Sequence, residues 1–180
     1  MSAQTVNEMA PAFALPATDG RTVSLSDIMG ENGAVVAFIC NHCPYVVSAA
    51  RRMAADAETL AGEGIGFAAI CANDATRYPA DSFDRMKDFA TQNGFSFPYL
   101  HDENQDIATA YGAEVTPHFF GVDRDGRIKY VGRMDAGTTG APPADAPREL
   151  VEAMRTIAAT GEGPATQHRP AGCSIKWKPA

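Results

Sequence analysis

The sequence is short of the features that mark membrane and nucleic-acid-binding proteins. None of its hydrophobic runs approaches the roughly 20 residues that a helix needs to cross a bilayer. Lys and Arg total 15 against 22 Asp and Glu, which gives a formal charge of −7. Basic residues gather only at Arg51-Arg52 and at Lys176 and Lys178, whereas nucleic-acid binders usually carry a clustered basic face. We therefore expect neither a membrane nor a nucleic-acid partner.

A secretory signal is also missing from the first 20 residues, where no cationic segment precedes an apolar core. The expected location is therefore cytoplasmic. Only four cysteines are present. In a reducing compartment structural disulfides are uncommon, so a close pair of cysteines is more often catalytic or metal-binding.

What the sequence does contain is the composition of one globular domain. It is 45% hydrophobic and 21% charged, with 16 Gly and 12 Pro to mark turns. The length of 180 residues suits a single domain over residues 1–180. We assign residues 1–33 to an N-terminal extension and residues 161–180 to a C-terminal tail with little periodicity of its own.

The hydrophobic pattern predicts a β-α-β unit. A continuous apolar run over Ala34–Cys40 predicts a buried strand, and a second run over Ile65–Cys71 predicts another. Between them, Pro44–Ala61 carries an apolar stripe at helical spacing, with Pro in its first turn and Gly62 after its end. Strands joined in this way are parallel, with a right-handed crossover, almost without exception.

Further strands and helices are expected around this unit. Phe13–Leu15 and Thr22–Leu25 predict a short hairpin, and His118–Val122 and Arg127–Gly132 predict a second one with Asp-Gly at its turn. The other expected elements are helices over Asp81–Gln92, Glu103–Tyr111 and Arg148–Ala159, a strand at Pro98–Leu100 and a loop over Met134–Ala146. Together these elements predict an α/β fold.

Two cysteines lie where the first strand meets the helix, in the segment Cys40-Asn41-His42-Cys43-Pro44. Near a helix N-terminus, free backbone N–H groups and the positive end of the dipole favour thiolate over thiol. Two intervening residues let the sulfurs meet across one helical turn and close a disulfide with little backbone movement. A C-x-x-C pair beside a β-α-β unit is typical of thioredoxin-like redox proteins, although metal-binding knuckles and inert buried thiols share this spacing.

A second candidate feature is the dipeptide Thr116-Pro117, directly before an expected strand. Proline is tolerated as the first residue of a strand, and a cis bond there makes a tight turn. We expect a cis bond at Pro117, with an ordinary trans turn proline as the alternative.

These segments resemble the peroxiredoxin-like branch of the thioredoxin superfamily, whose bacterial members are often described as alkyl hydroperoxide reductase/thiol-specific antioxidant or redoxin proteins. The resemblance spans nearly the whole chain and rests on Phe38–Val46, Tyr111-Gly112, Thr116–Phe120 and Gly172–Trp177. It implies a thioredoxin-like fold with a central mixed sheet flanked by helices, an N-terminal hairpin extension, and an inserted helix and strand before Pro117. It also implies that Pro117 lies against the sulfur pair and shapes a substrate groove.

The resemblance does not extend to the peroxide pocket. Peroxiredoxins carry a P-x-x-x-T-x-x-C loop in which the Thr and a distant Arg hold the peroxide. When Cys43 is aligned with the peroxidatic cysteine, Cys40 stands in place of the Thr and Val36 in place of the Pro. An arginine such as Arg133 could still approach the site. The replacement of Thr by a second thiol favours thiol–disulfide exchange over peroxidase activity.

The order of attack within the pair stays open. The thioredoxin pattern makes Cys40 the nucleophile and Cys43 the resolving thiol, whereas the peroxiredoxin alignment points to Cys43 as the nucleophile. His42 lies just before the second cysteine, as in strongly oxidising disulfide donors. We expect it to stabilise a thiolate and so to make the pair more oxidising than the pair of thioredoxin. The reduction potential of thioredoxin is about −270 mV.

The general base is also unassigned. Thioredoxin has a buried acid upstream of its first cysteine, and Ala34 stands at that position here. The candidates are His42, Glu114, His118 or water, and none of them is favoured by spacing.

The remaining cysteines and histidines carry different expectations. Cys71 ends an apolar strand, where a free cysteine commonly behaves as a small hydrophobe. Cys173 lies in a glycine-flanked tail with the only tryptophan, Trp177, for which we expect a hydrophobic dock. If the tail folds back, Cys173 could serve as an auxiliary resolving thiol, with an inert thiol as the alternative. His101 and His168 are expected at the surface.

We predict a thiol–disulfide oxidoreductase that works through a mixed disulfide at the Cys40–Cys43 pair. Expected partners are a disulfide-containing protein or small oxidant and an electron donor such as thioredoxin or glutathione. No organic cofactor and no resident metal are expected, because sulfur itself carries out the redox chemistry. Two alternatives stay open: a thiol peroxidase with Cys43 as the peroxidatic residue, and a copper or zinc carrier that uses the same cysteines. The residues expected to tune the pair or line its groove are Asn41, His42, Pro44, Thr116 and Pro117.

Overall fold

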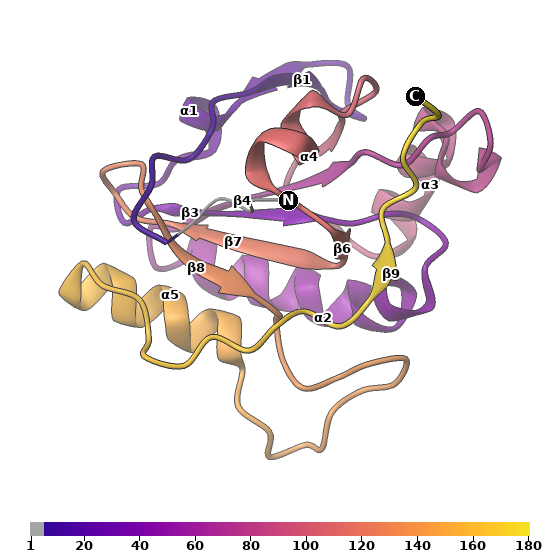
Figure 1. Cartoon of the computed structure of the whole chain (residues 1–180). Coiled ribbons are helices and arrows are strands. Elements are labelled where there is room, and N and C mark those ends of the chain that lie inside the picture. The colour runs from indigo at the N-terminus through magenta and orange to yellow at the C-terminus, as the bar shows by residue number, and fades with distance from the viewer. Residues whose placement is uncertain (1–5) are drawn as a thin grey trace.

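A five-stranded mixed sheet forms the centre of the computed structural model, which describes residues 6–180 (Figure 1). β3 pairs in parallel with β4, and β4 in parallel with β5, whereas β7 is antiparallel to both β3 and β8. The predicted mixed sheet is therefore confirmed. In spatial order the strands are β5 (Tyr99–His101), β4 (Gly66–Cys71), β3 (Ala34–Phe38), β7 (His118–Val122) and β8 (Ile128–Gly132).

The predicted β-α-β unit is also confirmed. Helix α2 covers Pro44–Ala61, with the bounds that the sequence predicts, and connects β3 to its parallel neighbour β4. Pro44 suits the first turn because its missing N–H would have no intrahelical partner there. Strand β3 ends two residues before the predicted end at Cys40, so the cysteine lies in the connection between strand and helix.

Side chains of β3 alternate between the two faces of the sheet and build two hydrophobic layers. Val35 and Ala37 join the layer beneath α2 and α5 (Glu149–Thr160), and Val36 and Phe38 join the layer beneath α4 (Asp106–Tyr111) and the N-terminal hairpin. Figure 1 shows α2 and α5 on one side of the sheet and α4 with the hairpin on the other. Because both faces are covered, the strand reads as an unbroken apolar run.

The N-terminal extension forms the predicted hairpin, with one correction at its end. Strand β1 (Ala14–Pro16) pairs antiparallel with β2 (Thr22–Ser24). Leu25, predicted in the strand, instead begins the short helix α1 (Leu25–Ile28), because Ser24 and Asp27 form a capping box. Residues 1–5 of the predicted extension lie outside the described residues.

The predicted insertion lies between β4 and β6 (Val115–Thr116), and its helices begin later than the sequence suggests. The helix predicted from Asp81 starts at Phe83 as α3 (Phe83–Gln92), because the Ser82 side chain accepts the N–H of Arg85 and caps it. Asp81 instead ends the 3-10 helix η1 (Pro79–Asp81). Helix α4 likewise starts at Asp106 rather than Glu103.

The C-terminal tail runs past the end of the central sheet and forms a separate two-stranded sheet with β6. Strand β9 (Cys173–Ser174) is antiparallel to β6, with Cys173 opposite Thr116. The next residue, Ile175, is 3% exposed and packs in the layer beneath α4, and its N–H donates to the carbonyl oxygen of Glu114. In Figure 1 the yellow tail passes alongside β6 on its way to the C-terminus. A segment without periodicity is thus fixed by strand pairing and one buried side chain.

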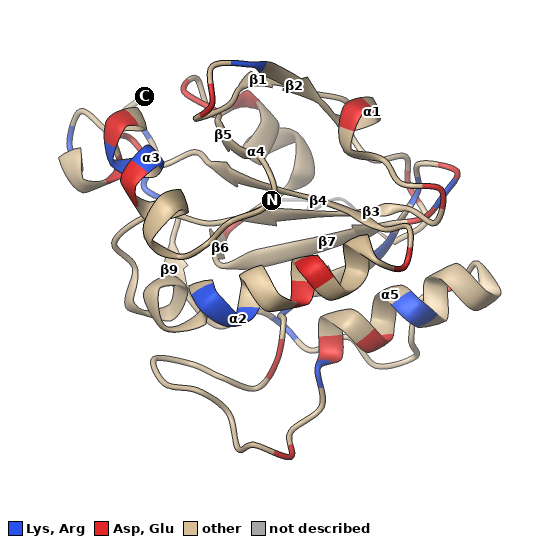
Figure 2. Ribbon diagram, turned by 180° about the vertical axis from the view of Figure 1, so that it is seen from behind, with Lys and Arg blue, Asp and Glu red and all other residues tan. Residues whose placement is uncertain are grey.

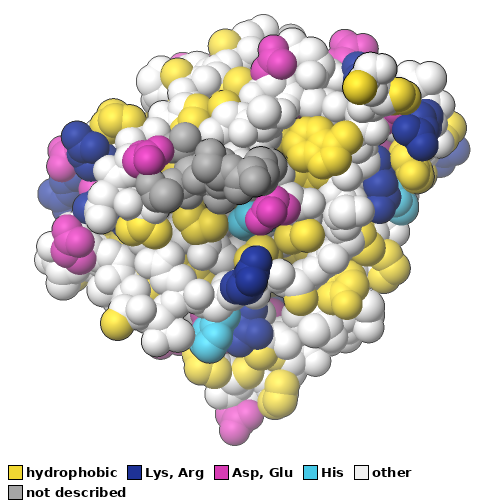
Figure 3. All heavy atoms as spheres, viewed as in Figure 1, with side chains coloured by type: hydrophobic (Ala, Val, Ile, Leu, Met, Phe, Trp, Pro, Cys, Tyr) yellow, Lys and Arg dark blue, Asp and Glu magenta, His cyan; other side chains and the backbone are white. Residues whose placement is uncertain are grey.

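Charges are mixed over the surface. Figure 2 shows Lys and Arg spread over α2, α3, α5 and several loops, with acidic residues between them. The face seen in Figure 3 carries hydrophobic, basic and acidic side chains side by side. Within residues 6–180, every helix is too short or too polar to cross a membrane.

Candidate redox site

The two motif cysteines lie together beyond the end of β3 and are buried. Cys40 is 0% exposed and Cys43 is 1% exposed. The backbone N–H of Cys43 donates to Cys40 Sγ over 3.3 Å, and the two thiols are hydrogen-bonded to each other. Cys43 is also the N-cap residue of α2, so its sulfur lies beside backbone N–H groups of the first turn. The structure brings together the pair that the spacing predicts.

The Thr116–Pro117 peptide bond is cis, as predicted, and Thr116 lies against both sulfurs. Thr116 Oγ1 is 3.5 Å from Cys40 Sγ. In its protonated form the thiol of Cys43 donates to the Thr116 carbonyl oxygen, also over 3.5 Å. Thr116 is 2% exposed, while Pro117 is half-buried at the start of β7. The proline turn therefore completes the wall around the sulfur pair.

The two sulfurs have different electrostatic surroundings. The hydrogen bond from the Cys40 thiol lowers the pKa of Cys43 to about 4, and backbone N–H groups of Val46 and Cys173 act in the same direction. That hydrogen bond, burial and the negative charge of Asp81 raise the pKa of Cys40. A thiol–thiol contact stabilises a thiolate on either sulfur, so the neighbours decide which one ionises. The acid on the Cys40 side and the helix N-terminus on the Cys43 side favour Cys43 as the thiolate.

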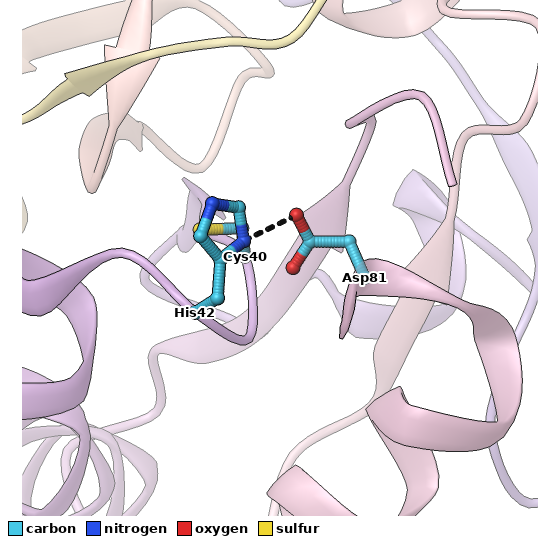
Figure 4. Close-up of side chains that lie close together, drawn as sticks. All are labelled: Cys40, His42 and Asp81. Carbon is cyan, nitrogen blue, oxygen red and sulfur yellow. Dashed lines mark ion pairs between the residues drawn. The ribbon is translucent and has the colours of Figure 1, made fainter. Parts of the chain in front are cut away.

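A buried carboxylate that the sequence analysis missed lies beside the motif. Asp81 is 0% exposed and accepts the backbone N–H of Asn41 at 2.8 Å and the side-chain amide of Asn73 at 2.9 Å. His42 Nδ1 lies 2.7 Å from its Oδ2 (Figure 4). Asp81 thus supplies the buried acid that is absent at Ala34. No local pattern marks it, because it belongs to the insertion, 40 residues after Asn41.

The two residues between the cysteines are tied to the same insertion. The His42 ring stacks on Tyr78 with centroids 6.0 Å apart and planes at 6°, and its side chain is 34% exposed. Asn41 accepts a hydrogen bond from the Tyr99 hydroxyl at 2.7 Å and donates to the carbonyl oxygen of Ala80 at 3.1 Å. These contacts fix the shape of the motif loop from outside the β-α-β unit.

Three side chains of the site could hold a metal ion. The Cys40 sulfur, a His42 nitrogen and an Asp81 oxygen, drawn in Figure 4, all lie within 4.8 Å of one another. The Cys43 sulfur is not part of this group. The copper or zinc alternative, which uses Cys40 and Cys43 with His42 or Cys173 as a further ligand, shares only Cys40 and His42 with this group and stays a prediction.

The tail brings a third thiol to the pair. Cys173 is half-buried on β9, and its thiol is hydrogen-bonded to the sulfur of Cys43. Burial, together with this contact, raises the pKa of Cys173 to about 11. The dock expected for Trp177 was wrong, because that ring is 38% exposed and Ile175 is the buried tail residue.

Cys71 and the three histidines outside the motif have surroundings of their own. Cys71 is 0% exposed, and burial raises its pKa to about 12, which confirms its prediction as a core residue. His118 is buried, which lowers its pKa to about 4, and its Nδ1 accepts the N–H of Glu114. His168 is exposed as predicted, whereas His101 was wrongly predicted at the surface and is half-buried against Phe83.

Arg133, the arginine considered for peroxide binding, is already paired. Its Nε and Nη2 both donate to the Glu149 carboxylate at 2.8 Å. It shares a small cavity with Pro117 and Tyr45. Its guanidinium is therefore near the proline turn, but it is held by an acid.

The sheet, the dithiol at a helix N-terminus and the adjacent cis-proline together define a thioredoxin-fold redox protein. The AhpC/TSA family model matches residues 6–131, and the chain belongs to this family. A "putative peroxiredoxin" of Mycobacterium tuberculosis is 26% identical over 148 residues, which cover 76% of this chain and 88% of that protein.

Two solved structures show how far the likeness extends. The crystal structure of an uncharacterized conserved protein from Geobacillus kaustophilus is 38% identical, with a TM-score of 0.89, and covers 98% of this chain and 94% of that one. The thioredoxin domain of a thiol-disulfide oxidoreductase from Bacteroides vulgatus is 17% identical, with a TM-score of 0.59, over 70% of this chain and 86% of that one. The second likeness shows the shared fold.

Proposed function

We propose that this redoxin is a thiol–disulfide oxidoreductase that uses Cys43 as its nucleophile and Cys40 as its partner. The observation that carries the proposal is the buried, hydrogen-bonded thiol pair at the N-terminus of α2, beside cis-Pro117. A lowered pKa keeps Cys43 in the thiolate form that attacks disulfides. A cytoplasmic location is part of this proposal.

The reaction has two exchange steps. The Cys43 thiolate attacks one sulfur of a substrate disulfide, the substrate S–S bond breaks, and the departing thiolate takes up a proton. Cys40 then attacks the Cys43 sulfur of the mixed disulfide and releases the second substrate thiol. The substrate gains two electrons and the protein holds a Cys40–Cys43 disulfide. A dithiol donor or glutathione returns the pair to its reduced form.

Asp81 is the proposed proton acceptor for the second step. Cys40 must lose its proton before it can attack, and it lies in a site closed to water. Asp81 is the buried carboxylate next to it, within 4.8 Å of its sulfur. Because His42, Asn41 and Asn73 hold its oxygens, the acid keeps a fixed position beside the thiol.

The surface around the motif suits a disulfide-bearing polypeptide or a small oxidant. His42, Pro44 and Val47 are exposed at the start of α2, and Val47 is 53% exposed. A groove of about 630 Å³ begins at Asn41 and continues between η1 and α3. We propose that the exposed residues at the start of α2 and the groove that reaches the motif at Asn41 form the docking surface for the substrate.

A thiol peroxidase is the second candidate, and family membership favours it. In that reaction the Cys43 thiolate attacks a hydroperoxide, becomes a sulfenic acid and releases an alcohol, and Cys40 condenses with it to a disulfide and water. The pairing of Arg133 with Glu149 weighs against it, since no free guanidinium is offered to the peroxide from that position.

Parallel rate measurements with a peptide disulfide and an organic hydroperoxide test the proposal. The reduced protein is mixed with each oxidant at equal concentration, and formation of the Cys40–Cys43 disulfide is followed by alkylation and mass mapping. We expect faster oxidation by the peptide disulfide. Faster oxidation by the hydroperoxide would instead support the peroxidase.

A further inference from the structure

The proposed exchange leaves one thiol of the site unused. Cys173 lies on the tail strand β9, against the sulfur of Cys43. We infer that Cys173 is a resolving thiol, which displaces the substrate from a mixed disulfide at Cys43 and closes a Cys43–Cys173 disulfide. The inference rests on the proposed function, namely exchange at Cys43.

Strand pairing delivers this thiol to the pair. In the β6–β9 register Cys173 is opposite Thr116, the residue whose carbonyl oxygen accepts the Cys43 thiol. Gly172 makes the approach possible, because a Cβ at that position would overlap the Thr116 carbonyl oxygen. Cys173 also packs against the hydrophobic layer that includes Cys40 and Cys43. Three sulfurs therefore meet around one residue.

The tail is held in place independently of its thiol. The N–H of Lys176 donates to the side-chain oxygen of Asn73 at 2.9 Å, and the Lys176 carbonyl accepts the N–H of Asp74 at 2.8 Å and the side chain of Gln105 at 3.0 Å. Ile175 is buried in the core. Asn73 in turn donates to Asp81, so one side chain connects the tail to the motif acid. The position of Cys173 beside the motif is therefore fixed by the contacts of the residues that follow it.

Cys173 has an advantage over Cys40 as the resolving thiol. Cys40 is 0% exposed and faces the Asp81 carboxylate, whose charge opposes a second thiolate. Cys173 is partly exposed; burial raises its pKa to about 11, and the charge of Lys176 acts in the opposite direction. Once Cys43 is part of a mixed disulfide, its negative charge is gone, and the repulsion that it exerted on a Cys173 thiolate disappears with it.

The added steps balance in atoms and electrons. The Cys173 thiolate attacks the Cys43 sulfur of the mixed disulfide, the bond from Cys43 to the substrate breaks, and the substrate thiolate leaves and takes up a proton. The Cys40 thiolate then attacks Cys43, releases Cys173 and forms the Cys40–Cys43 disulfide. The substrate disulfide is the only oxidant, and it receives two electrons as before.

A chromogenic aromatic disulfide tests the inference, because attack by Cys43 and attack by Cys173 on the mixed disulfide each release one coloured thiol. In Cys40→Ser we expect two equivalents per protein, the second released at a rate independent of protein concentration, and a Cys43–Cys173 disulfide in the mass map. Cys40→Ser/Cys173→Ser should stop at one equivalent. Cys40→Ser/Cys71→Ala is the matched control and should again release two, because Cys71 is a separate buried thiol.

A tail variant that keeps every thiol provides the second test. In the Cys40→Ser background, Gly172→Ala should slow the second release by about a hundredfold, because a misplaced reacting group loses that order of rate. Circular dichroism checks that the variants are folded. In wild-type protein treated with limiting oxidant, a transient Cys43–Cys173 peptide should precede the Cys40–Cys43 peptide.

The outcomes separate the inference from the proposed function. If Cys40→Ser stops at one equivalent while wild-type protein forms the Cys40–Cys43 disulfide, the role of Cys173 is overturned and the exchange reaction stands. Two equivalents from the Cys40→Ser/Cys173→Ser protein would also overturn it. If the wild-type protein does not react with any substrate disulfide, the proposed function itself is wrong.

Discussion

Buried sulfurs lie at the same end of two neighbouring parallel strands, yet the pKa values of two of them, Cys71 and Cys43, are shifted in opposite directions. Cys71 ends β4, and the Cys40–Cys43 pair follows β3; all three side chains are at most 1% exposed. Burial raises the pKa of Cys71 to about 12, whereas a thiol hydrogen bond lowers the pKa of Cys43 to about 4. Burial alone therefore does not decide whether a thiol is reactive. The donors around the sulfur decide it.

The chain that follows each strand creates this difference. After β3 the chain turns at once into the long helix α2, which presents free N–H groups and positions Cys43 next to a second thiol. After β4 it enters the insertion, which returns a buried acid, Asp81, to the motif. The segments that follow the ends of β3 and β4 thus supply a thiolate and a carboxylate, and each residue can be substituted separately.

The largest expected contrast is between Cys43→Ser and Cys71→Ala. Cys43→Ser removes the nucleophile and should lower the exchange rate by orders of magnitude. Cys71→Ala should leave the rate unchanged and reduce the free energy of unfolding by about 1 kcal/mol, as small core truncations do. Rates with a peptide disulfide and urea midpoints measure the two effects. A large loss of activity in Cys71→Ala would show that Cys71 also takes part in the exchange reaction.

The pH dependence of the thiolate should follow Cys43. Ultraviolet thiolate absorbance of the reduced protein should persist on acidification until about pH 4, where Cys43 takes up its proton. The unfolded thiol ionises near 8.5, so between about pH 4 and 8.5 the unfolded chain binds more protons and this group's contribution to stability rises with pH. Cys43→Ser should remove both effects. If the thiolate absorbance were lost in Cys40→Ser but kept in Cys43→Ser, Cys40 would be the thiolate.

Replacement of the buried acid Asp81 should have a smaller effect on the protein than replacement of the nucleophile Cys43. Asp81→Asn replaces an acceptor of three donors by an amide and should cost about 1–3 kcal/mol of unfolding free energy through unpaired buried groups. The pKa of Cys40 should fall, because the negative charge that raises it is gone. Asp84→Asn is the matched control, since its side chain is 89% exposed on α3. Equal stability of the two variants would contradict the structural role of Asp81.

The smallest expected effect concerns His42. His42→Ala removes the contact with Asp81 and the ring beside Cys40, so the reduced pair should be less stabilised. We expect a redox potential more negative by about 30 mV, which is a tenfold change in the equilibrium constant. His168→Ala, at an exposed position of the tail, should leave the potential unchanged. Equal potentials for both variants would exclude tuning by His42.

Local signals allowed the parts around β3 and α2 to be predicted from sequence. Pro44 and Gly62 mark both ends of α2, and unbroken apolar runs identify strands covered on both faces. The parallel pairing of β3 with β4 follows from the connecting helix. The C-x-x-C pair and the proline before β7 were found because their chemistry depends on neighbours in sequence.

Features created by tertiary contact escaped the same analysis. Asp81 was predicted as the first residue of a helix, and only the folded insertion returns it to Asn41. In the tail the large aromatic residue Trp177 was predicted to dock, whereas Ile175, directly after β9, is the residue that the fold buries. The contact of Cys173 with Cys43 depends on the pairing of a two-residue strand, which no periodicity can mark.

Titration in glutathione buffers tests whether Cys40 and Cys43 form a reversible disulfide. Purified protein is equilibrated over a range of reduced to oxidised glutathione, and all four cysteines are alkylated and mapped by mass. We predict a Cys40–Cys43 disulfide that forms and reopens with a potential between about −120 and −270 mV. If these two cysteines never pair at any buffer ratio, the account of this site is wrong.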